Sequence, residues 1–399
     1  MSDAARAAET AARDSYGRLL AYLAARTRDI GLAEDALGHA FAKALSDWPV
    51  SGVPDRPDAW LLTVARNAVT DRQRHLTRFH EDTEVPDMPA PEMADALPDK
   101  RLALLMVCAH PAIARDLHTP LMLQTVLGVE ARVIAQLFMV SPVALTKRLG
   151  RAKAKIKAAG IPFVLPGPED LPVRAAAIRE AIYGAHGLDW VDPGDGLGDE
   201  AIYLADLLAR LLPDDAEAAG LAALIAFGHA RARARVVDGV LVPTDAQDVG
   251  LWDERLQFYA DRQLTRAFGL GNVGRFQIEA AIQQVHMARK QTGETDWDAL
   301  NQLYHGLLQI SPSVGAQVAQ AVVTARLHGA AAGLSALAEI ERRCGGEVQP
   351  LWAARADMLS ELDDAVTACV AYDRAIALAT EAPVIAFLNA QRAKIIARI

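Results

Sequence analysis

The stretch from Val129 to Ala158 decides how the chain is interpreted, and it reads VEARVIAQLFMVSPVALTKRLGRAKAKIKA. It predicts two helices joined near residues 139–141, because Ser141 suits a helix N-cap and Pro142 suits the first turn that follows. The apolar residues of the second helix recur at intervals of three and four, which places them on one face: Leu145, Leu149, Ala152 and Ile156. The cations recur every four residues on the opposite face: Lys147, Arg151 and Lys155. We therefore expect a helix that packs on one side and presents cations on the other.

Two further details favour a helix-turn-helix that binds DNA. Ile134-Ala135 places a bulky residue and then a small one where the first helix must let the second cross closely. Gly150 falls on the exposed face, where a missing side chain lets the backbone approach DNA. A glycine inside a helix costs roughly 1 kcal/mol relative to alanine, so its presence requires a reason. A helix-turn-helix is the predicted structure, and an ordinary solvated basic face is the alternative.

The composition predicts an all-α protein. Of the 399 residues, 52% are hydrophobic and only 6% are aromatic, which favours close-packed helices over sheets. No apolar run reaches the length of a membrane span, and the three cysteines have no metal or disulfide spacing. The motifs of common nucleotide-binding and hydrolase sites are absent from the sequence. We expect a cytoplasmic protein that is not an enzyme and has no cofactor, metal site or membrane partner, with Cys108 and His110 serving core packing.

The distribution of charge reconciles a net charge of −9 with DNA binding. Residues 1–157 contain 21 Lys and Arg against 19 Asp and Glu, whereas residues 158–399 contain 20 against 31. Within the first part the acids gather at 81–99 and the bases at 66–78 and 147–157. The local field matters more than the total charge for binding phosphates. The basic segments therefore stay candidates for a nucleic-acid surface.

Two proline-rich segments divide the chain into domains. Residues 79–98 are acidic and lack apolar periodicity, which predicts a flexible linker, and residues 159–172 contain four prolines after the basic helix. The expected domains are 1–78, 99–158 and 173–399. The last consists of successive amphipathic helices, among them 249–268, with small residues such as Ala356 and Ala375 where helices pair. Within it, VVDGVLV at Val236–Val242 indicates a small hairpin.

The N-terminal part predicts three amphipathic helices. Residues 16–48 form two of them, broken near Asp29–Gly31, and residues 59–75 form the third. Between them, residues 49–58 (PVSGVPDRPD) are predicted to be a loop.

These motifs resemble a known family. Residues 16–75, with LAEDALGHAFAKAL and PDAWLLTVARNAVTDR, resemble region two of a bacterial extracytoplasmic-function (ECF) sigma factor of the sigma-70 family. Residues 101–157, from RLALLMVCAHPAI to the basic helix, resemble region four, its helix-turn-helix domain. The remainder resembles the long extension, similar to tetratricopeptide (TPR) repeats, of one sigma subgroup. The resemblance implies a transcription initiation factor whose partners are core RNA polymerase, promoter DNA and a protein or small-molecule regulator of the C-terminal domain.

The resemblance also implies site residues by position. Polymerase contacts are implied for Glu34, Asp35, Leu37 and Phe41. Contacts with the −10 promoter element, where loop 51–58 would hold a flipped base, are implied for Asp55, Arg56, Trp60, Arg66, Asn67 and Arg72. Contacts with the −35 element are implied for Thr146, Lys147, Arg148, Arg151, Lys153 and Lys155. Among these, Thr146, Lys147 and Arg151 would read base edges, and Arg148 and Lys153 would bind phosphates.

Two other functions stay open at this point. Gly38-His39 stands where the family usually has Gln-Glu, so a helix-turn-helix regulator or decayed paralogue that does not engage polymerase is the first alternative. The second is an interaction scaffold in which the TPR-like region is the active part and the basic helix is incidental.

Overall fold

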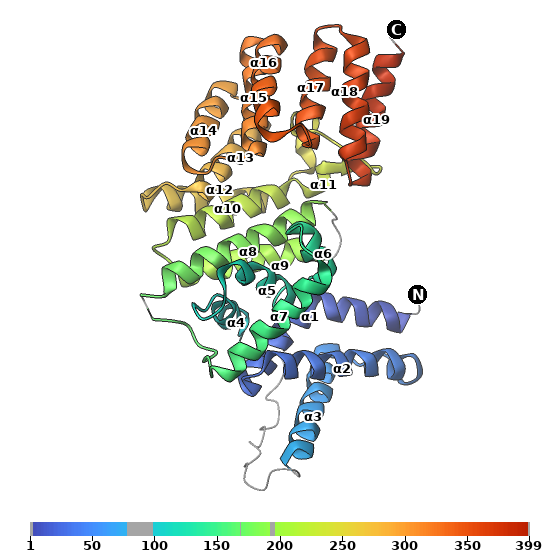
Figure 1. Cartoon of the computed structure of the whole chain (residues 1–399), viewed down its shortest axis with the longest axis vertical. Helices are drawn as coiled ribbons and strands as arrows, with labels where there is room; N and C mark the ends of the chain where they lie inside the picture. The colour runs from blue at the N-terminus through green and yellow to red at the C-terminus, as the bar shows by residue number, and fades with distance from the viewer. Residues whose placement is uncertain (1–2, 78–98, 168, 192–195, 398–399) are drawn as a thin grey trace. The chain divides into compact units, whose positions relative to one another are not determined.

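The computed structural model describes residues 3–77, 99–167, 169–191 and 196–397. Across these residues the regular structure is helical apart from one two-stranded hairpin, so the all-α prediction is confirmed (Figure 1). The chain separates into two compact units, residues 1–207 and 208–399. Among the described residues, no helix combines the length and hydrophobicity that crossing a membrane requires.

The first unit is built from helices. They are α1 (Asp3–Thr27), α2 (Ile30–Ser51), α3 (Pro57–Thr77), α4 (Arg101–Cys108), the 3-10 helix η2 (Arg115–Leu117), α5 (His118–Thr125), α6 (Ala131–Leu137), α7 (Pro142–Ala158), α8 (Leu171–Val191) and α9 (Leu197–Leu211), the last of which continues into the second unit. The predicted linker 79–98 lies outside the described residues.

The predicted break between the first two helices is confirmed. Arg28 has a φ of 54°, and the Asp29 carboxylate caps α2 by accepting from the Leu32 amide at 3.1 Å. The predicted loop 49–58 is shorter in the structure. Helix α2 continues to Ser51 with Pro49 in its last turn, and the Gly52 amide donates to the Trp48 carbonyl at 3.0 Å. Helix α3 then begins at Pro57, because proline suits the first position of a helix.

Helices α4, α5 and α8 pack together in the core of the first unit. All residues of α4 are buried, and α8 packs against both α4 and α5. The buried Arg174 side chain of α8 donates to the Met106 carbonyl at 3.2 Å. Within the proline-rich segment 159–172, Ile161 and Phe163 are also buried. This segment is therefore anchored by apolar side chains.

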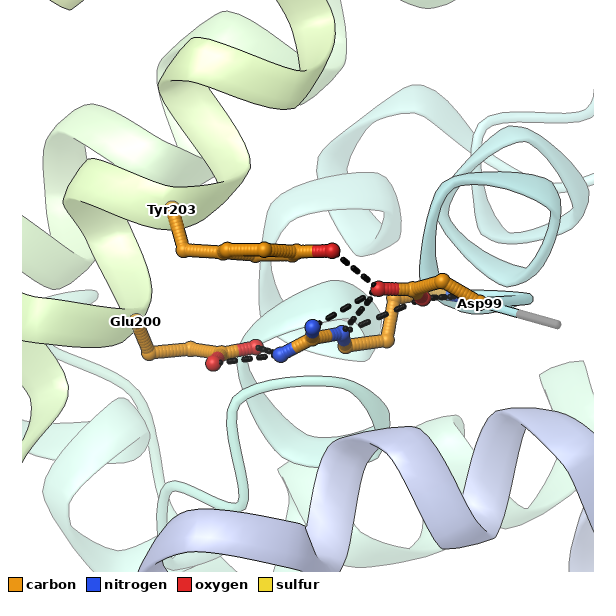
Figure 2. Close-up of polar contacts among 4 residues, drawn as sticks. Asp99, Glu200 and Tyr203 are labelled. Carbon is orange, nitrogen blue, oxygen red and sulfur yellow. Dashed lines mark hydrogen bonds and ion pairs between the residues drawn. The ribbon is translucent and has the colours of Figure 1, made fainter. Parts of the chain in front are cut away.

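A polar cluster joins the start of α4 to α9, and Figure 2 shows Asp99, Glu200 and Tyr203 around it. The Arg101 guanidinium bonds both carboxylates, at 2.7 Å to Asp99 and 2.6 Å to Glu200. It also lies over the Tyr203 ring, 4.1 Å from its centroid, and the Tyr203 hydroxyl donates to Asp99 at 2.6 Å. The Arg101 side chain is only 9% exposed, so this guanidinium depends on its two carboxylate partners.

The two carboxylates of this cluster respond differently to the same cation. Burial would raise the pKa of Asp99, but the hydrogen bonds from Arg101 and Tyr203 outweigh it and hold the pKa below its usual value. Burial raises the pKa of Glu200, and the nearby Arg101 offsets this only in part. Asp99 is therefore the more firmly ionised partner of Arg101.

The second unit contains the remaining helices and the hairpin. They are α10 (Ala216–Ala230), α11 (Ala232–Arg235), β1 (Val236–Val237), β2 (Val240–Leu241), η3 (Thr244–Ala246), η4 (Val249–Leu251), α12 (Glu254–Gly269), α13 (Arg275–Thr292), α14 (Trp297–Ile310), α15 (Val314–His328), α16 (Ala330–Cys344), α17 (Gln349–Glu361), α18 (Ala365–Leu378) and α19 (Ala382–Ile396).

Helix α10 forms the core of this unit, because it is buried on all sides and packs against α12 and α13. Its Glu217 carboxylate accepts from the Phe276 and Gln277 amides at 3.1 and 3.2 Å, which satisfies donors at the start of α13. Gly220 permits the close approach, since an added Cβ would lie 2.8 Å from the Gln277 backbone nitrogen. Packing and capping thus use the same face of α10.

The predicted hairpin is confirmed. Strands β1 and β2 pair antiparallel, with Val237 opposite Val240. The turn residues Asp238 and Gly239 have φ values of 51° and 77°, as the tight turn favoured in two-residue hairpins requires.

The later helices pack in succession, and Figure 1 shows α14 to α19 as a row of antiparallel neighbours. The predicted pairing at small residues is confirmed, because Ala356 and Ala375 share one buried cluster with Tyr372. The helix predicted at 249–268 begins later than expected. Residues 249–251 form η4, and α12 starts at Glu254 because Asp253 caps it, accepting from the Leu256 amide at 3.0 Å.

His286 on α13 should make the second unit sensitive to acid. Burial lowers its pKa from 6.5 to about 4, with Arg231 adding to the effect. Below about pH 6.5 the unfolded chain binds a proton at this histidine more readily than the folded chain does. His286 therefore lowers the free energy of unfolding progressively as the pH falls from about 6.5 toward 4, and has no such effect above that range. We expect His286→Gln to reduce the difference between the urea-unfolding midpoints at neutral and mildly acidic pH. His305→Gln, at an exposed histidine of α14, is the matched control. If it reduces the difference between the two midpoints equally, the acid sensitivity does not come from His286.

Candidate nucleic-acid interface

Helices α6 and α7 meet through a short turn at residues 138–141. The turn is closed by the Val140 amide donating to the Ala135 carbonyl at 2.9 Å, and Met139 adopts a φ of 51°. Ile134 and Ala135 are buried as expected, and Ser141 occupies the N-cap of α7 with Pro142 next to it. The Ser141 side chain makes no capping hydrogen bond, so the capping expected of its hydroxyl is wrong.

Helix α7 has the two faces that its sequence predicts. Its apolar residues are all buried: Leu145, Leu149, Ala152 and Ile156. Lys147, Arg151 and Lys155 are exposed, and an added Cβ at Gly150 would meet nothing within 4 Å. Thr146 is exposed as well, and its hydroxyl donates to the Pro142 carbonyl at 2.9 Å. The structure thus brings Thr146, Lys147 and Arg151 onto one accessible face of α7.

The other three implied −35 residues each contact an oxygen within the chain. Arg148 pairs with Asp116 of η2. The Lys155 ammonium donates to the Ala112 carbonyl at 2.6 Å. The Lys153 ammonium bonds Glu34 at 2.6 Å and the Gln124 side-chain oxygen at 2.8 Å. None of these partners of α7 was anticipated from the sequence, because they lie between 29 and 119 residues away.

An apolar cluster at the entry to α7 was also missed. It consists of Leu137, Phe138, Met139, Val140 and Val143, of which Met139 is 92% exposed and Val143 is 65% exposed. The signal was present in the sequence, since four consecutive apolar residues precede Ser141 and Val143 follows it. Apolar side chains beside cations at the entry of such a helix can contact thymine methyl groups.

The implied −10 residues lie along α3 and the loop before it, with unequal exposure. Asp55 and Asn67 are exposed, and Arg56 is half-buried. Trp60 packs edge-on against the buried Trp48, with ring centroids 5.5 Å apart. Arg66 is only 9% exposed, so we remove it from the residues expected to contact DNA directly.

The residues of α2 implied to contact polymerase also differ in exposure. Asp35 is exposed and pairs with Arg72 of α3 at 3.3 Å. Phe41 is half-buried. Leu37 is fully buried at 0% exposure, so its side chain belongs to the core, and a direct contact with another protein is not expected. Glu34 forms an ion pair with Lys153. One residue implied to contact polymerase is therefore bonded to one implied to contact DNA.

Cys108 lies in the core of the first unit. Among the described residues, no group of histidine, cysteine and carboxylate side chains is arranged to hold a metal ion. Cys108 is fully buried, burial raises its pKa to about 12, and its thiol lies 3.4 Å from the Thr125 hydroxyl. Its expected role in core packing is therefore confirmed.

Comparison with known families adds to this geometry. Residues 12–79, which contain α2, α3 and most of α1, match the family Sigma-70 region 2. This part of the chain is similar to region 2 of the sigma-70 factors. The match supports a sigma factor's role in binding RNA polymerase and recognising promoters.

Two further comparisons extend beyond residue 79. Residues 174–268 match a family of unknown function. An uncharacterised protein of Rhizobium meliloti (strain 1021) is 35% identical over 397 residues, covering 94% of this chain and 92% of the relative. The two proteins are members of one family over nearly their whole lengths. No solved structure matches the chain.

Proposed function

We propose that this chain is an alternative sigma factor of the ECF type. It binds core RNA polymerase through α2, contacts the −10 promoter element through α3 and the preceding loop, and reads the −35 element through α7. The proposed domains are region two at 1–78 and region four at 99–158, followed by a TPR-like extension at 173–399 that modulates activity. In this proposal the chain itself catalyses no covalent reaction.

One observation carries the −35 assignment: α7 follows a tight turn, packs its apolar face inward and leaves Lys147 and Arg151 exposed beside Gly150. The second helix of such a unit lies in the major groove, where its exposed side chains reach base edges. An arginine matches the two acceptors of a guanine edge, which gives Arg151 its proposed role.

The first test is formation of holoenzyme. The purified chain is mixed with core RNA polymerase, and run-off transcripts are sequenced from a library of genomic promoters. A sigma factor co-purifies with the core enzyme and starts transcripts at a shared pair of promoter elements. A chain that binds DNA but never co-purifies with core polymerase is instead a regulator without polymerase contact.

Arg151→Ala should weaken holoenzyme binding to a selected promoter by about 1–3 kcal/mol and relax selectivity at one −35 position. The expected loss comes from the two hydrogen bonds to one base edge. Lys153→Ala should instead lower the salt slope of binding by about one unit on all sequences, because it contributes a phosphate contact. Competition binding of the holoenzyme to promoter variants measures both effects. An equal loss on every sequence for Arg151→Ala would contradict base reading by this residue.

A further inference from the structure

Two surfaces with different proposed partners are joined within the first unit. Glu34 belongs to the polymerase-facing helix α2, and Lys153 belongs to the DNA-facing helix α7. The Lys153 ammonium bonds the two Glu34 oxygens at 2.6 and 2.7 Å. The side chains are only 13% and 23% exposed, so this pair is shielded from water more than an ordinary surface ion pair. Gln124 of α5 bonds the same ammonium at 2.8 Å.

The contact extends beyond one ion pair. Lys157, one turn further along α7, pairs with Asp29 at the N-cap of α2, at 2.7 Å. Helix α1 approaches the end of α5 so closely that an added Cβ at Gly17 would lie 2.2 Å from the Val126 carbonyl oxygen. An added Cβ at Gly128 would lie 3.3 Å from the Tyr16 ring. The two helical segments therefore meet through close backbone packing as well as through charge.

The cations of α7 differ in whether the chain itself occupies them. Arg148 and Lys153, which would contact the DNA backbone, each bond an oxygen of the chain, and so does Lys155. Lys147 and Arg151, the proposed base readers, remain exposed. Because each neutralised phosphate adds to affinity and to its salt dependence, occupied backbone contacts weaken binding to any DNA sequence. Base reading alone cannot replace them.

We propose that the Lys153–Glu34 and Lys157–Asp29 pairs form an intramolecular latch in which Glu34 competes with DNA phosphate for Lys153. This inference rests on the proposed function. When core polymerase engages α2 at Glu34, Lys153 becomes available to phosphate. Because coupling between two binding sites is reciprocal, promoter DNA that takes Lys153 strengthens polymerase binding by the same factor. The free chain therefore has one phosphate contact fewer than the chain bound to polymerase.

A lysine footprint tests the latch without DNA or polymerase. The full chain is treated briefly with an amine-acylating reagent, and modification at each lysine is measured by mass spectrometry. We expect Lys153 to react several-fold more slowly than the exposed Lys147. In Glu34→Gln, its rate should approach that of Lys147, whereas Asp47→Asn, the same loss of charge elsewhere on α2, should leave it unchanged. Equal reactivity of Lys153 and Lys147 in the unmodified chain overturns the latch.

A double-mutant cycle then tests the competition with phosphate. Binding of the full chain to a labelled duplex of mixed sequence is followed by fluorescence anisotropy as salt is varied. Lys153→Gln should lower the salt slope less in the otherwise unmodified chain, where Glu34 holds this lysine, than in the Glu34→Gln background. Glu34→Gln should steepen the slope by about one unit, and adding Lys153→Gln should abolish that gain. A slope unchanged by Glu34→Gln overturns the competition.

The two proposals fail in distinguishable ways. If the footprint shows the latch but the chain never forms holoenzyme, the proposed function is wrong and the latch stands as a property of the fold. If holoenzyme forms while Lys153 of the free chain reacts as fast as Lys147, the sigma function stands and the latch is wrong.

Discussion

Replacing Arg101 with alanine is expected to destabilise the first unit by about 3–5 kcal/mol, because the change leaves two largely buried carboxylates without their cation. Arg101 lies between Asp99 and Glu200, whose side chains are each 22% exposed. The measurement is urea unfolding of the full chain, with hydrogen exchange across α4 and α9 to locate the loss. Both helices should exchange faster, since this cluster joins them.

Tyr203→Phe is the matched control for Arg101→Ala. It keeps the ring beneath the guanidinium and removes only the hydrogen bond to Asp99, which is typically a net loss of about 0.5–1.5 kcal/mol. If Arg101→Ala lowers the free energy of unfolding no more than Tyr203→Phe does, the guanidinium is not the centre of the cluster.

A chain that ends at Gly167 is expected to lose the folded structure of α4 to α7. Helix α8, which packs against α4 and α5, contributes fully buried residues that include Ile178 and Ile182. Each such side chain contributes about 1.5–3 kcal/mol by burial, and the truncation also removes the Glu200 partner of Arg101. Together these losses approach the whole stability of a typical domain, about 5–15 kcal/mol.

A chain that ends at Leu212, after α9, is the control for the truncation, and it should keep these contacts. Far-UV circular dichroism and the dispersion of amide resonances compare the two truncated chains. The domain boundaries inferred from the proline-rich segment 159–172 predict the opposite result, an independently folded region four without α8. A well-dispersed spectrum from the chain ending at Gly167 would favour those boundaries.

Most of the fold could be predicted from the sequence because helices leave local signals. The period of Leu145, Leu149, Ala152 and Ile156 predicted the buried face of α7. The Asp-Gly pair at Asp238 predicted the hairpin. Helix ends were predicted less accurately, as with α2, which runs through Pro49 to Ser51 where a loop was expected from residue 49.

The candidate site was predictable only in part. The sequence identified the exposed cations Lys147 and Arg151, since a polar face needs only the helical period to be recognised. It did not predict that Leu37 is fully buried or that Arg66 is nearly so. Exposure of one side chain depends on how several helices pack around it, and a motif does not contain that information.

What the sequence by itself determined is the all-α class, the helices of the N-terminal part, the hairpin and the basic face of α7. These follow from contacts between residues a few positions apart. Only the tertiary structure decided that Lys153 bonds Glu34, 119 residues away, and that Arg101 bonds Glu200, 99 residues away. The physical reason is that an ion pair requires two side chains at one point in space, and the packing of intervening helices alone sets which charges meet there.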